Sequence, residues 1–252
     1  MLDKHKVLIL SRNNFSNKKV YINRIELWEL SEDEALSLMG KGVIHDTSIY
    51  LSKSKLFGDN KRVSQNFAQA AVTWLFPFNL KNKKLANIDL RKCLHKNFNK
   101  IDFIHRFRPD HKEALGFLPK TLLGGGKEIV KNDLKDLDCS QFNGIKLVFD
   151  IPKELGGQVE GICKYVKSSY SKIGIKIKCN PIQFGLLIER IKRGVSEISF
   201  MAQTMDFFDV EYFFNTFESN SNFNISNFIS TKVDLLLRKA RTTADRFERL
   251  KY

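Results

Sequence analysis

The sequence has no apolar run of the length that a membrane span needs. About 18 or more consecutive apolar residues mark a transmembrane helix, and no such run occurs among the 252 residues. Near the amino terminus only the short stretch Val7–Leu10 is apolar, whereas a secretion signal needs a longer apolar segment and a small-residue cleavage site. We therefore expect no membrane span, and no signal peptide is visible in this chain.

Cysteine and histidine are sparse and scattered. The four cysteines form no C-x-x-C pair, and the five histidines do not gather at the spacing of a zinc site. The sequence therefore predicts no metal site and no cofactor. Cys163 and Cys179 occupy apolar-periodic positions, which favours small buried hydrophobic residues. Spacing alone leaves a disulfide, and hence an oxidising compartment, open.

Motifs of nucleic-acid binding and of catalysis are missing as well. The formal net charge is +14, but lysine and arginine are spread along the whole chain, which favours a solvated basic surface. The triple glycine 124–126 lacks the Lys-Ser/Thr of a phosphate-binding loop. No nucleophile elbow, metal-ligating histidine pair or Ser/His/Asp grouping is present. We expect neither a nucleic-acid partner nor enzymatic activity.

The clearest organisation lies between residues 143 and 202, where strand and helix patterns alternate. Apolar residues at every second position predict three strands, over 145–151, 175–179 and 198–200. Helical spacing of apolar residues predicts one helix over 159–173 and a second that Pro181 opens and Gly194 ends. This succession of elements with short loops is typical of an α/β sheet with right-handed crossovers.

The stretch QTMDFFDVEYFFNTF, Gln203–Phe217, begins just after the third predicted strand. Ligands of α/β sheets bind beyond the carboxyl ends of the strands, so we expect Asp206 to face a ligand. A carboxylate in an apolar cleft pairs with an ammonium group through a short, charge-assisted hydrogen bond. The alternative is a helix cap or turn acid, which we favour for Asp209. The phenylalanines that follow at helical spacing are expected in the core.

Local signals also define elements on either side of this region. A strand pattern over 20–30 precedes Ser31 and Glu34, which have the spacing of a capping box at a helix start. A further helix is expected over 88–98, and Thr231 is expected to cap another, with a second helical stretch at the carboxyl end. Because the helical pattern runs up to the last residue, we expect a partial protein.

Five segments carry motifs in a recognisable order along nearly the whole chain. They are VYINRIELWELSEDEALSLMGKGVIHD, FNLKNKKLANIDLRKCLHKNF, GFLPKTLLGGG, IGIKIKCNPIQF and SNFNISNFISTKVDLLLRKARTTADRFERLKY. The order resembles that of the large extracellular solute-binding proteins of peptide ABC importers, family 5. Asn79 and Arg91 match the second motif, whereas Lys84 replaces its usual proline and Cys93 its usual alanine. The last segment is the most specific match.

The family motif Trp-x-x-Asp-Tyr-x-Asp/Glu-Pro is the counterpart of residues 203–210. In peptide binders of this type the first acid pairs with the ligand's α-ammonium group, and Asp206 falls on that position. Gln203 stands in place of the Trp and Val210 in place of the Pro. The resemblance implies ligand contacts from five residues of this segment: Gln203, Thr204, Met205, Asp206 and Phe207.

The resemblance also implies a fold and a function. Family members have two lobes that close on a ligand and are much longer than this chain. We therefore expect an incomplete two-lobed α/β fold of the periplasmic-binding-protein type II, with residues 1–76 in lobe I and 77–252 in lobe II. The implied function is the monomeric substrate-binding component of an ABC transporter, periplasmic or on the cell surface, with a peptide or related small solute as ligand and permease subunits as partners. The alternatives are the sensing domain of a solute-responsive transcriptional regulator and a non-functional gene fragment.

Overall fold

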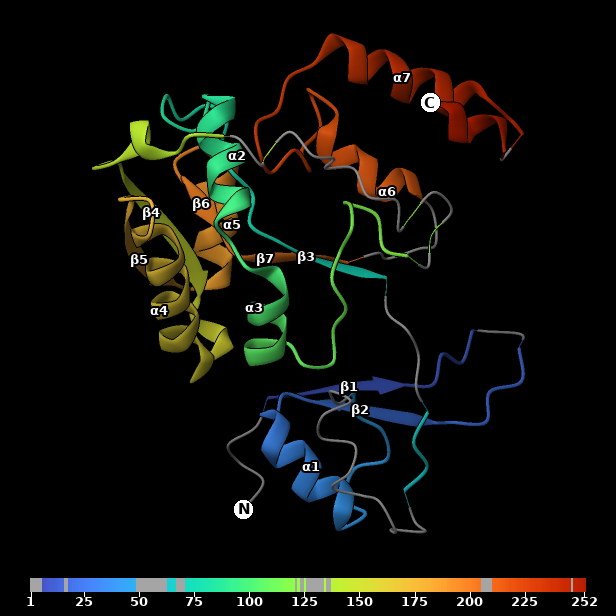
Figure 1. Ribbon diagram of the computed structural model, residues 1–252. Helices are drawn as coiled ribbons and strands as arrows, with labels where there is room; N and C mark the ends of the chain where they lie inside the picture. Colours follow the sequence, from blue (N-terminus) through green and yellow to red (C-terminus); the bar gives the residue numbers. More distant parts are fainter. Residues whose placement is uncertain are drawn as a thin grey trace. The chain divides into compact units, whose positions relative to one another are not determined.

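The computed structural model describes residues 6–15, 18–48, 63–66, 71–120, 137–204, 210–245 and 247–252, with single residues 122, 125 and 134 (Figure 1). The chain forms two compact units, Met1–Ala68 and Gln69–Tyr252. None of the helices in the described ranges has the length and apolar character of a membrane span.

The first unit contains a two-stranded antiparallel sheet and one helix. β1 (Val7–Ser11) pairs with β2 (Arg24–Trp28), and α1 (Glu32–Gly40) follows. The expected capping box is confirmed, because Ser31 Oγ accepts the Glu34 N–H at 3.4 Å and Glu34 Oε2 accepts the Ser31 N–H at 3.0 Å. Two backbone N–H groups at the start of the helix are thereby satisfied.

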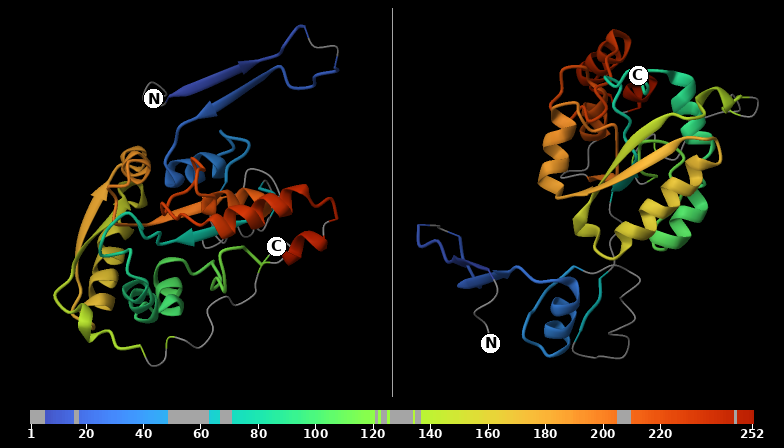
Figure 2. Two further views of the ribbon diagram at one scale, coloured as in Figure 1. Left: turned by 90° about the horizontal axis from the view of Figure 1, so that it is seen from above. Right: turned by 90° about the vertical axis from the view of Figure 1, so that its left-hand side faces the viewer.

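The second unit is built around the three-stranded parallel sheet that the sequence predicts. β4 (Lys146–Pro152) lies between β5 (Lys176–Ile182) and the short β6 (Ile198–Ser199). The crossovers carry α4 (Gln158–Ser171) and α5 (Phe184–Lys192). The right-hand view of Figure 2 shows these helices on opposite sides of β4 and β5. The alternation of strands and helices is therefore confirmed.

The main core of this unit packs against one face of the sheet. Residues of α4 contribute to it together with α2 (Ile88–Lys96) and α3 (Lys100–Phe107). Because side chains alternate along a strand, Asp150 points to the other face, where α5 contacts it through Arg190. The buried members from β4 are Leu147, Phe149 and Ile151.

After β6 the chain leaves the parallel sheet. β7 (Met201–Thr204) pairs antiparallel with β3 (Val72–Leu75). The sequence predicts a third strand over 198–200 with the candidate site at its carboxyl end. The structure instead places Gln203 and Thr204 within β7, in a second, two-stranded sheet.

The pairing of β3 with β7 also explains where the two units divide. It attaches residues 72–75 to the unit Gln69–Tyr252, whereas the predicted lobe boundary falls between residues 76 and 77. The assignment of these units to lobes I and II stays a prediction.

Trp74 anchors β3 in the second unit. Its indole Nε1 donates to His111 Nε2 at 3.1 Å, and its ring stacks on Phe200 with 5.0 Å between the centroids. The Arg108 guanidinium lies 4.4 Å from the indole centroid, within the range of a cation–π contact. Burial and the charge of Arg108 lower the pKa of His111, which favours the neutral imidazole that can accept this hydrogen bond.

The position of Pro181 differs from the prediction. β5 continues through Pro181 to Ile182, and α5 starts only at Phe184. β5 is an edge strand, so the N–H that proline lacks costs no hydrogen bond of the sheet. The carboxylate of Glu154 accepts the Phe184 N–H at 2.9 Å and so satisfies a free donor at the start of the helix.

The four cysteines form two disulfides, Cys93–Cys139 and Cys163–Cys179. The prediction that Cys163 and Cys179 are merely small buried hydrophobic residues is therefore wrong. The α4 and β5 backbones bring their Cα atoms to 5.9 Å, a separation that a disulfide can bridge. The oxidising compartment that the spacing left open gains support.

The carboxyl-terminal region is helical, with two differences from the prediction. α7 (Thr231–Thr242) is capped by Ser230 and not by Thr231, because Ser230 Oγ accepts the Val233 N–H at 3.3 Å. The expected last helix is reduced to a short 3-10 segment over residues 248–251. The remaining short elements are η2 (Ser140–Phe142), η3 (Lys153–Leu155), α6 (Val210–Phe214), η4 (Asn215–Phe217) and η5 (Glu248–Lys251).

Candidate ligand-binding site

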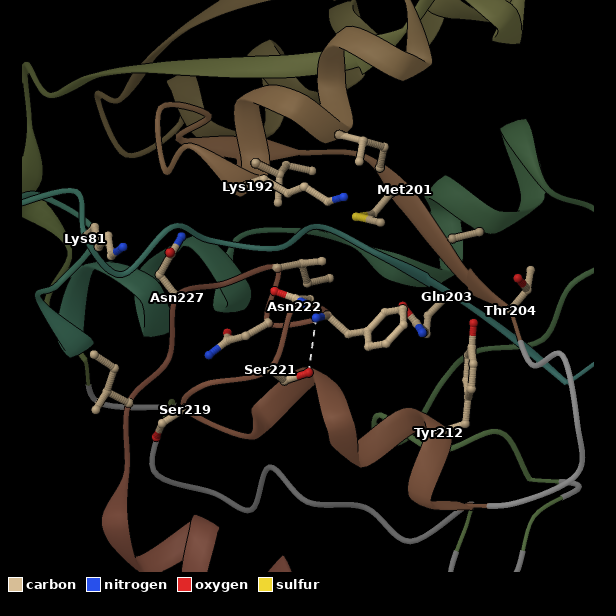
Figure 3. Close-up of a pocket in the computed structure, with 17 residues that line it drawn as sticks. Lys81, Lys192, Met201, Gln203, Thr204, Tyr212, Ser219, Ser221, Asn222 and Asn227 are labelled. Carbon is tan, nitrogen blue, oxygen red and sulfur yellow. Dashed lines mark hydrogen bonds between the residues drawn. The ribbon is translucent and has the colours of Figure 1, made fainter.

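A pocket of about 730 Å³ lies beside β7 in the second unit. Its walls come from β7, α5, α6 and the loop 219–229 that precedes α7, as Figure 3 shows. A volume of this size is typical of small-molecule sites. We call it the β7 pocket. Its polar lining residues include Lys81, Lys192, Gln203, Thr204, Tyr212, Ser219, Ser221, Asn222, Asn224 and Asn227.

Two of the five predicted site residues line the β7 pocket. Gln203 is 8% exposed and Thr204 is exposed, and both belong to the wall. The Gln203 side chain makes no hydrogen bond with any residue in the described part of the chain, so its carboxamide is available to a ligand. The other predicted residues lie outside the described residues, and their contacts stay predictions: Met205, Asp206 and Phe207, together with Asp209.

The apolar wall of the β7 pocket is a small hydrophobic cluster. Met201 on β7 packs with Leu187 and Ile191 on α5, and Ile225 of the loop packs against this group. Met201 and Gln203 are 6% and 8% exposed, because a strand turns alternate side chains to the same face. The cluster therefore fixes the strand that presents Gln203.

Hydrogen bonds hold the loop 219–229 in place. Ser219 N–H donates to Asp234 Oδ1 at 2.9 Å, and Ser230 N–H donates to Ser219 Oγ at 3.0 Å. The bonds from Ser219 lower the pKa of the Asp234 carboxyl, because they stabilise its charged form. Within the loop, Phe223 N–H donates to Ser221 Oγ at 3.1 Å, drawn as the dashed line in Figure 3.

Asn79 joins three segments around the β7 pocket. The side chain is 5% exposed, and its Nδ2 donates to the Gly194 carbonyl at 2.7 Å. Its Oδ1 accepts from the Lys81 N–H and from Asn227 Nδ2, both at 3.1 Å. Asn227 has a backbone φ of +53°, which L-residues adopt rarely but asparagine tolerates best. Asn79 therefore links this loop conformation to Lys81 and to Gly194, which follows α5.

Replacing Asn79 by alanine should lower the free energy of unfolding by about 2 kcal/mol, because three hydrogen bonds of a buried carboxamide are lost. Amide hydrogen exchange of the loop 219–229 should increase as well, because Asn227 loses its partner. The matched control is Asn222→Ala, at an exposed position in the same loop. Equal changes in the two variants would contradict the role assigned to Asn79.

Sequence reasoning missed most of the pocket. It located Gln203 and Thr204, but it assigned no binding role to the polar stretch 220–227, to Lys81 or to Lys192. One available signal was the segment SNFNISNF, which combines asparagines and apolar residues just after the predicted site. No group of three or more potential metal ligands occurs in the described part of the chain.

A family model for "Bacterial extracellular solute-binding proteins, family 5 Middle" matches residues 2–225. This match covers most of the 252 residues, and the chain belongs to this family. No curated protein matches the chain. The expectation that the protein is not an enzyme agrees with a family of solute-binding proteins, and it stays a prediction for this chain.

Three of the solved structures that share the fold are complexes with a bound peptide, and this chain spans about half of each of them. DppA of Helicobacter pylori in complex with the peptide STSA has a TM-score of 0.81 at 20% identity, over 100% of this chain and 52% of its own. A dipeptide-binding protein from a Pseudoalteromonas species in complex with Met-Leu has a TM-score of 0.81 at 14% identity, over 98% of this chain and 52% of its own. AppA of Bacillus subtilis in complex with a nonapeptide has a TM-score of 0.77 at 15% identity, over 98% and 56%.

These likenesses show the fold. The chain has part of the two-lobed α/β fold of periplasmic binding proteins and spans about half the length of the solved structures it matches. The predicted family and fold class are confirmed.

Proposed function

We propose that this chain is the ligand-contacting part of a substrate-binding protein that captures peptides for an ABC importer. The observation that carries the proposal is the β7 pocket, whose wall includes Gln203 and Thr204, the latter two positions before Asp206 in the sequence. Family membership supports a solute as ligand. Apolar and polar side chains in one pocket together suit a peptide, whose backbone offers donors and acceptors at regular intervals.

Asp206 is the proposed anchor for the ligand's α-ammonium group. Its carboxylate would follow β7 within two residues of Thr204, and a charge-assisted hydrogen bond to ammonium is stronger than one between neutral groups. Closure of a lobed protein around the ligand requires that the ligand bind the closed state better than the open state. Permease subunits of the importer are the proposed partners, and a monomer is the proposed state.

The disulfides favour an exported protein over a cytoplasmic regulator. Cys93–Cys139 and Cys163–Cys179 are both formed, and stable disulfides belong to the periplasm and other oxidising compartments. We therefore propose that the protein is located in the periplasm or at the cell surface.

A thermal melt of the 252-residue chain with short peptides tests the proposal. Peptides at about 100 times their Kd stabilise a binding protein by about 2.7 kcal/mol, which raises Tm by roughly 5–10 °C in a chain of this size. Asp206→Asn should abolish this shift, and N-acetylated peptides should not produce it in the wild type. Asp209→Asn is the matched control and should keep the shift.

Two results would contradict the proposal in different ways. A cooperative melt that no peptide raises would rule out peptide binding by this chain. An equal shift in wild type and Asp206→Asn would keep peptide binding and remove Asp206 as the anchor.

A further inference from the structure

α7 lies beside the wall of the β7 pocket without contributing to it. Figure 1 shows α7 alongside α6, and a hydrogen bond joins the two helices. None of the described residues of the wall belongs to α7, whereas Tyr212 of α6 and several residues of the loop 219–229 line the pocket. The contacts of α7 therefore show how this part of the wall is held.

One face of α7 carries Asp234, Leu237 and Arg241. Residues three, four and seven positions apart lie on the same side of a helix. Leu237 is buried, and Asp234 accepts the Ser219 N–H at the start of the loop. This face of α7 therefore contacts the segment 211–219, which leads from α6 into the loop.

The Arg241 guanidinium donates to three residues of that segment. Its Nε donates to Glu211 Oε1 at 2.6 Å. Its Nη1 and Nη2 donate to Oε1 and Oε2 of Glu218 at 2.7 and 2.9 Å, and Nη2 also donates to Asn215 Oδ1 at 2.8 Å. The planar fork of arginine suits such paired contacts with a carboxylate. One side chain thus joins α7 to α6, to η4 and to the residue before the loop.

This network differs from an ordinary surface ion pair. The Arg241 side chain is 31% exposed, and exposed pairs contribute measurably when the arginine is bidentate and belongs to a network. The bonds from Arg241 lower the pKa of the Glu218 carboxyl, because they stabilise its charged form.

α6 depends on such contacts because it is too short to be stable alone. It has five residues, Val210–Phe214, and isolated helices shorter than about 12 residues are marginal in water. Phe213 is fully buried, with 5.5 Å between its ring centroid and that of Phe117. Neighbouring residues of a helix point about 100° apart. The contacts of Glu211 and Phe213 therefore fix the direction of Tyr212, which lies between them in the sequence.

Tyr212 is the residue that α6 presents to the pocket. Figure 3 shows its side chain extending toward Gln203 and Thr204 on β7. Its ring also contacts Phe223 of the loop, with 6.2 Å between the centroids. A rotation of α6 would therefore move this aromatic wall and change its contact with the loop at the same time.

We propose that Arg241 is a positioning residue of the β7 pocket, which holds α6 in the orientation that places Tyr212 against a bound ligand. The proposal rests on the proposed function and adds a residue outside the pocket wall that governs affinity. Arg241 acts through α6, by keeping the wall in its binding-competent arrangement before the ligand arrives. The affinity of a protein falls in proportion to the population of its competent arrangement.

Titration calorimetry of the 252-residue chain with the tripeptide Ala-Phe-Ala, well below the Tm, tests the proposal. Arg241→Ala should weaken binding about tenfold by depopulating the competent arrangement. Arg241→Lys should weaken it about threefold, because lysine keeps the charge but lacks the planar fork. The matched control is Arg238→Ala, which removes an exposed positive charge from the same helix and should leave the affinity unchanged.

A double-mutant cycle with Tyr212→Ala separates positioning from a loss of overall stability. If Arg241 acts through α6, Arg241→Ala should weaken binding much less in the Tyr212→Ala background than in the wild type. Additive losses in the cycle, or an unchanged affinity of Arg241→Ala, would overturn the proposal while peptide binding stands.

Hydrogen exchange of the protein without peptide gives a test that needs no ligand. Arg241→Ala should accelerate exchange of the amides of residues 211–219 and leave β4 and β5 unchanged. Equal exchange in the variant and the wild type overturns the proposal. If the wild type binds no peptide, the proposed function fails, and faster exchange confined to 211–219 still supports Arg241 as the residue that fixes this wall.

Discussion

Replacing Asp150 by alanine should destabilise the second unit by about 3 kcal/mol, because three hydrogen bonds to a buried carboxylate are lost, one of them from the partly exposed Arg190. The carboxylate is fully buried. Its Oδ2 accepts from Arg190 Nε at 3.1 Å and from Ser196 Oγ at 2.6 Å, while Oδ1 accepts from Asn180 Nδ2 at 2.6 Å. One side chain thus joins β4 to β5, to α5 and to the turn before β6.

Denaturant unfolding measures this loss, and the neighbouring pair on α5 provides the control. The Arg193–Glu189 pair lies at the carboxyl end of α5 and is exposed, so Glu189→Ala should cost no more than about 0.5 kcal/mol. Binding should decrease together with stability, because α5 carries Ile191 and Lys192 of the pocket wall. A cost below about 1 kcal/mol for Asp150→Ala would contradict the importance of the hydrogen bonds to this buried carboxylate.

Removing the disulfide Cys93–Cys139 should lower the free energy of unfolding by about 4 kcal/mol. The bond joins residues 46 positions apart, and closing a loop of that length in the unfolded chain accounts for this value in the entropic treatment. The other disulfide, Cys163–Cys179, spans 16 positions and should contribute about 3 kcal/mol by the same relation. The variants are Cys93→Ala with Cys139→Ala, and Cys163→Ala with Cys179→Ala.

Thermal melts with and without reductant check both values. Reduction should lower the Tm of the wild type by more than either double variant does alone. A protein without all four cysteines should show no response to reductant. Unchanged stability of the Cys93→Ala, Cys139→Ala protein would contradict the expected contribution of this bond.

Local sequence patterns were sufficient to predict those elements whose signals lie within a few residues of one another. Period-two alternation identified β4, and the Ser31–Glu34 spacing identified the start of α1. Both signals act between residues a few positions apart, so they can be read without knowledge of the fold.

The elements that depend on distant partners could not be predicted in this way. β7 forms because Met201–Thr204 meets Val72–Leu75 from a remote part of the chain, and no local period encodes that partner. The pairing of Cys163 with Cys179 follows from the packing of α4 on β5. Pro181 is tolerated in β5 because that strand lies at the edge, a fact that only the topology supplies.

The candidate site shows the same limit. Placement after a strand, together with the motif, located Gln203 and Thr204, but the wall opposite them comes from α5 and from the loop 219–229. Lys81 joins this wall through the hydrogen bonds of Asn79 to Gly194 and Asn227. Such contacts across long stretches of sequence become visible only in the folded chain.

The environment of Trp74 allows β3 to be monitored by intrinsic tryptophan fluorescence. The chain has two tryptophans, and Trp28 lies in the other unit, where its indole donates to Glu26. Trp74 lies opposite Ala202 of β7 and contacts both Phe200 and a neutral His111. A change in β3–β7 pairing would alter the polarity and quenching around this one indole. In a Trp28→Phe background, the emission of Trp74 thus reports on the strand that presents Gln203 to the pocket.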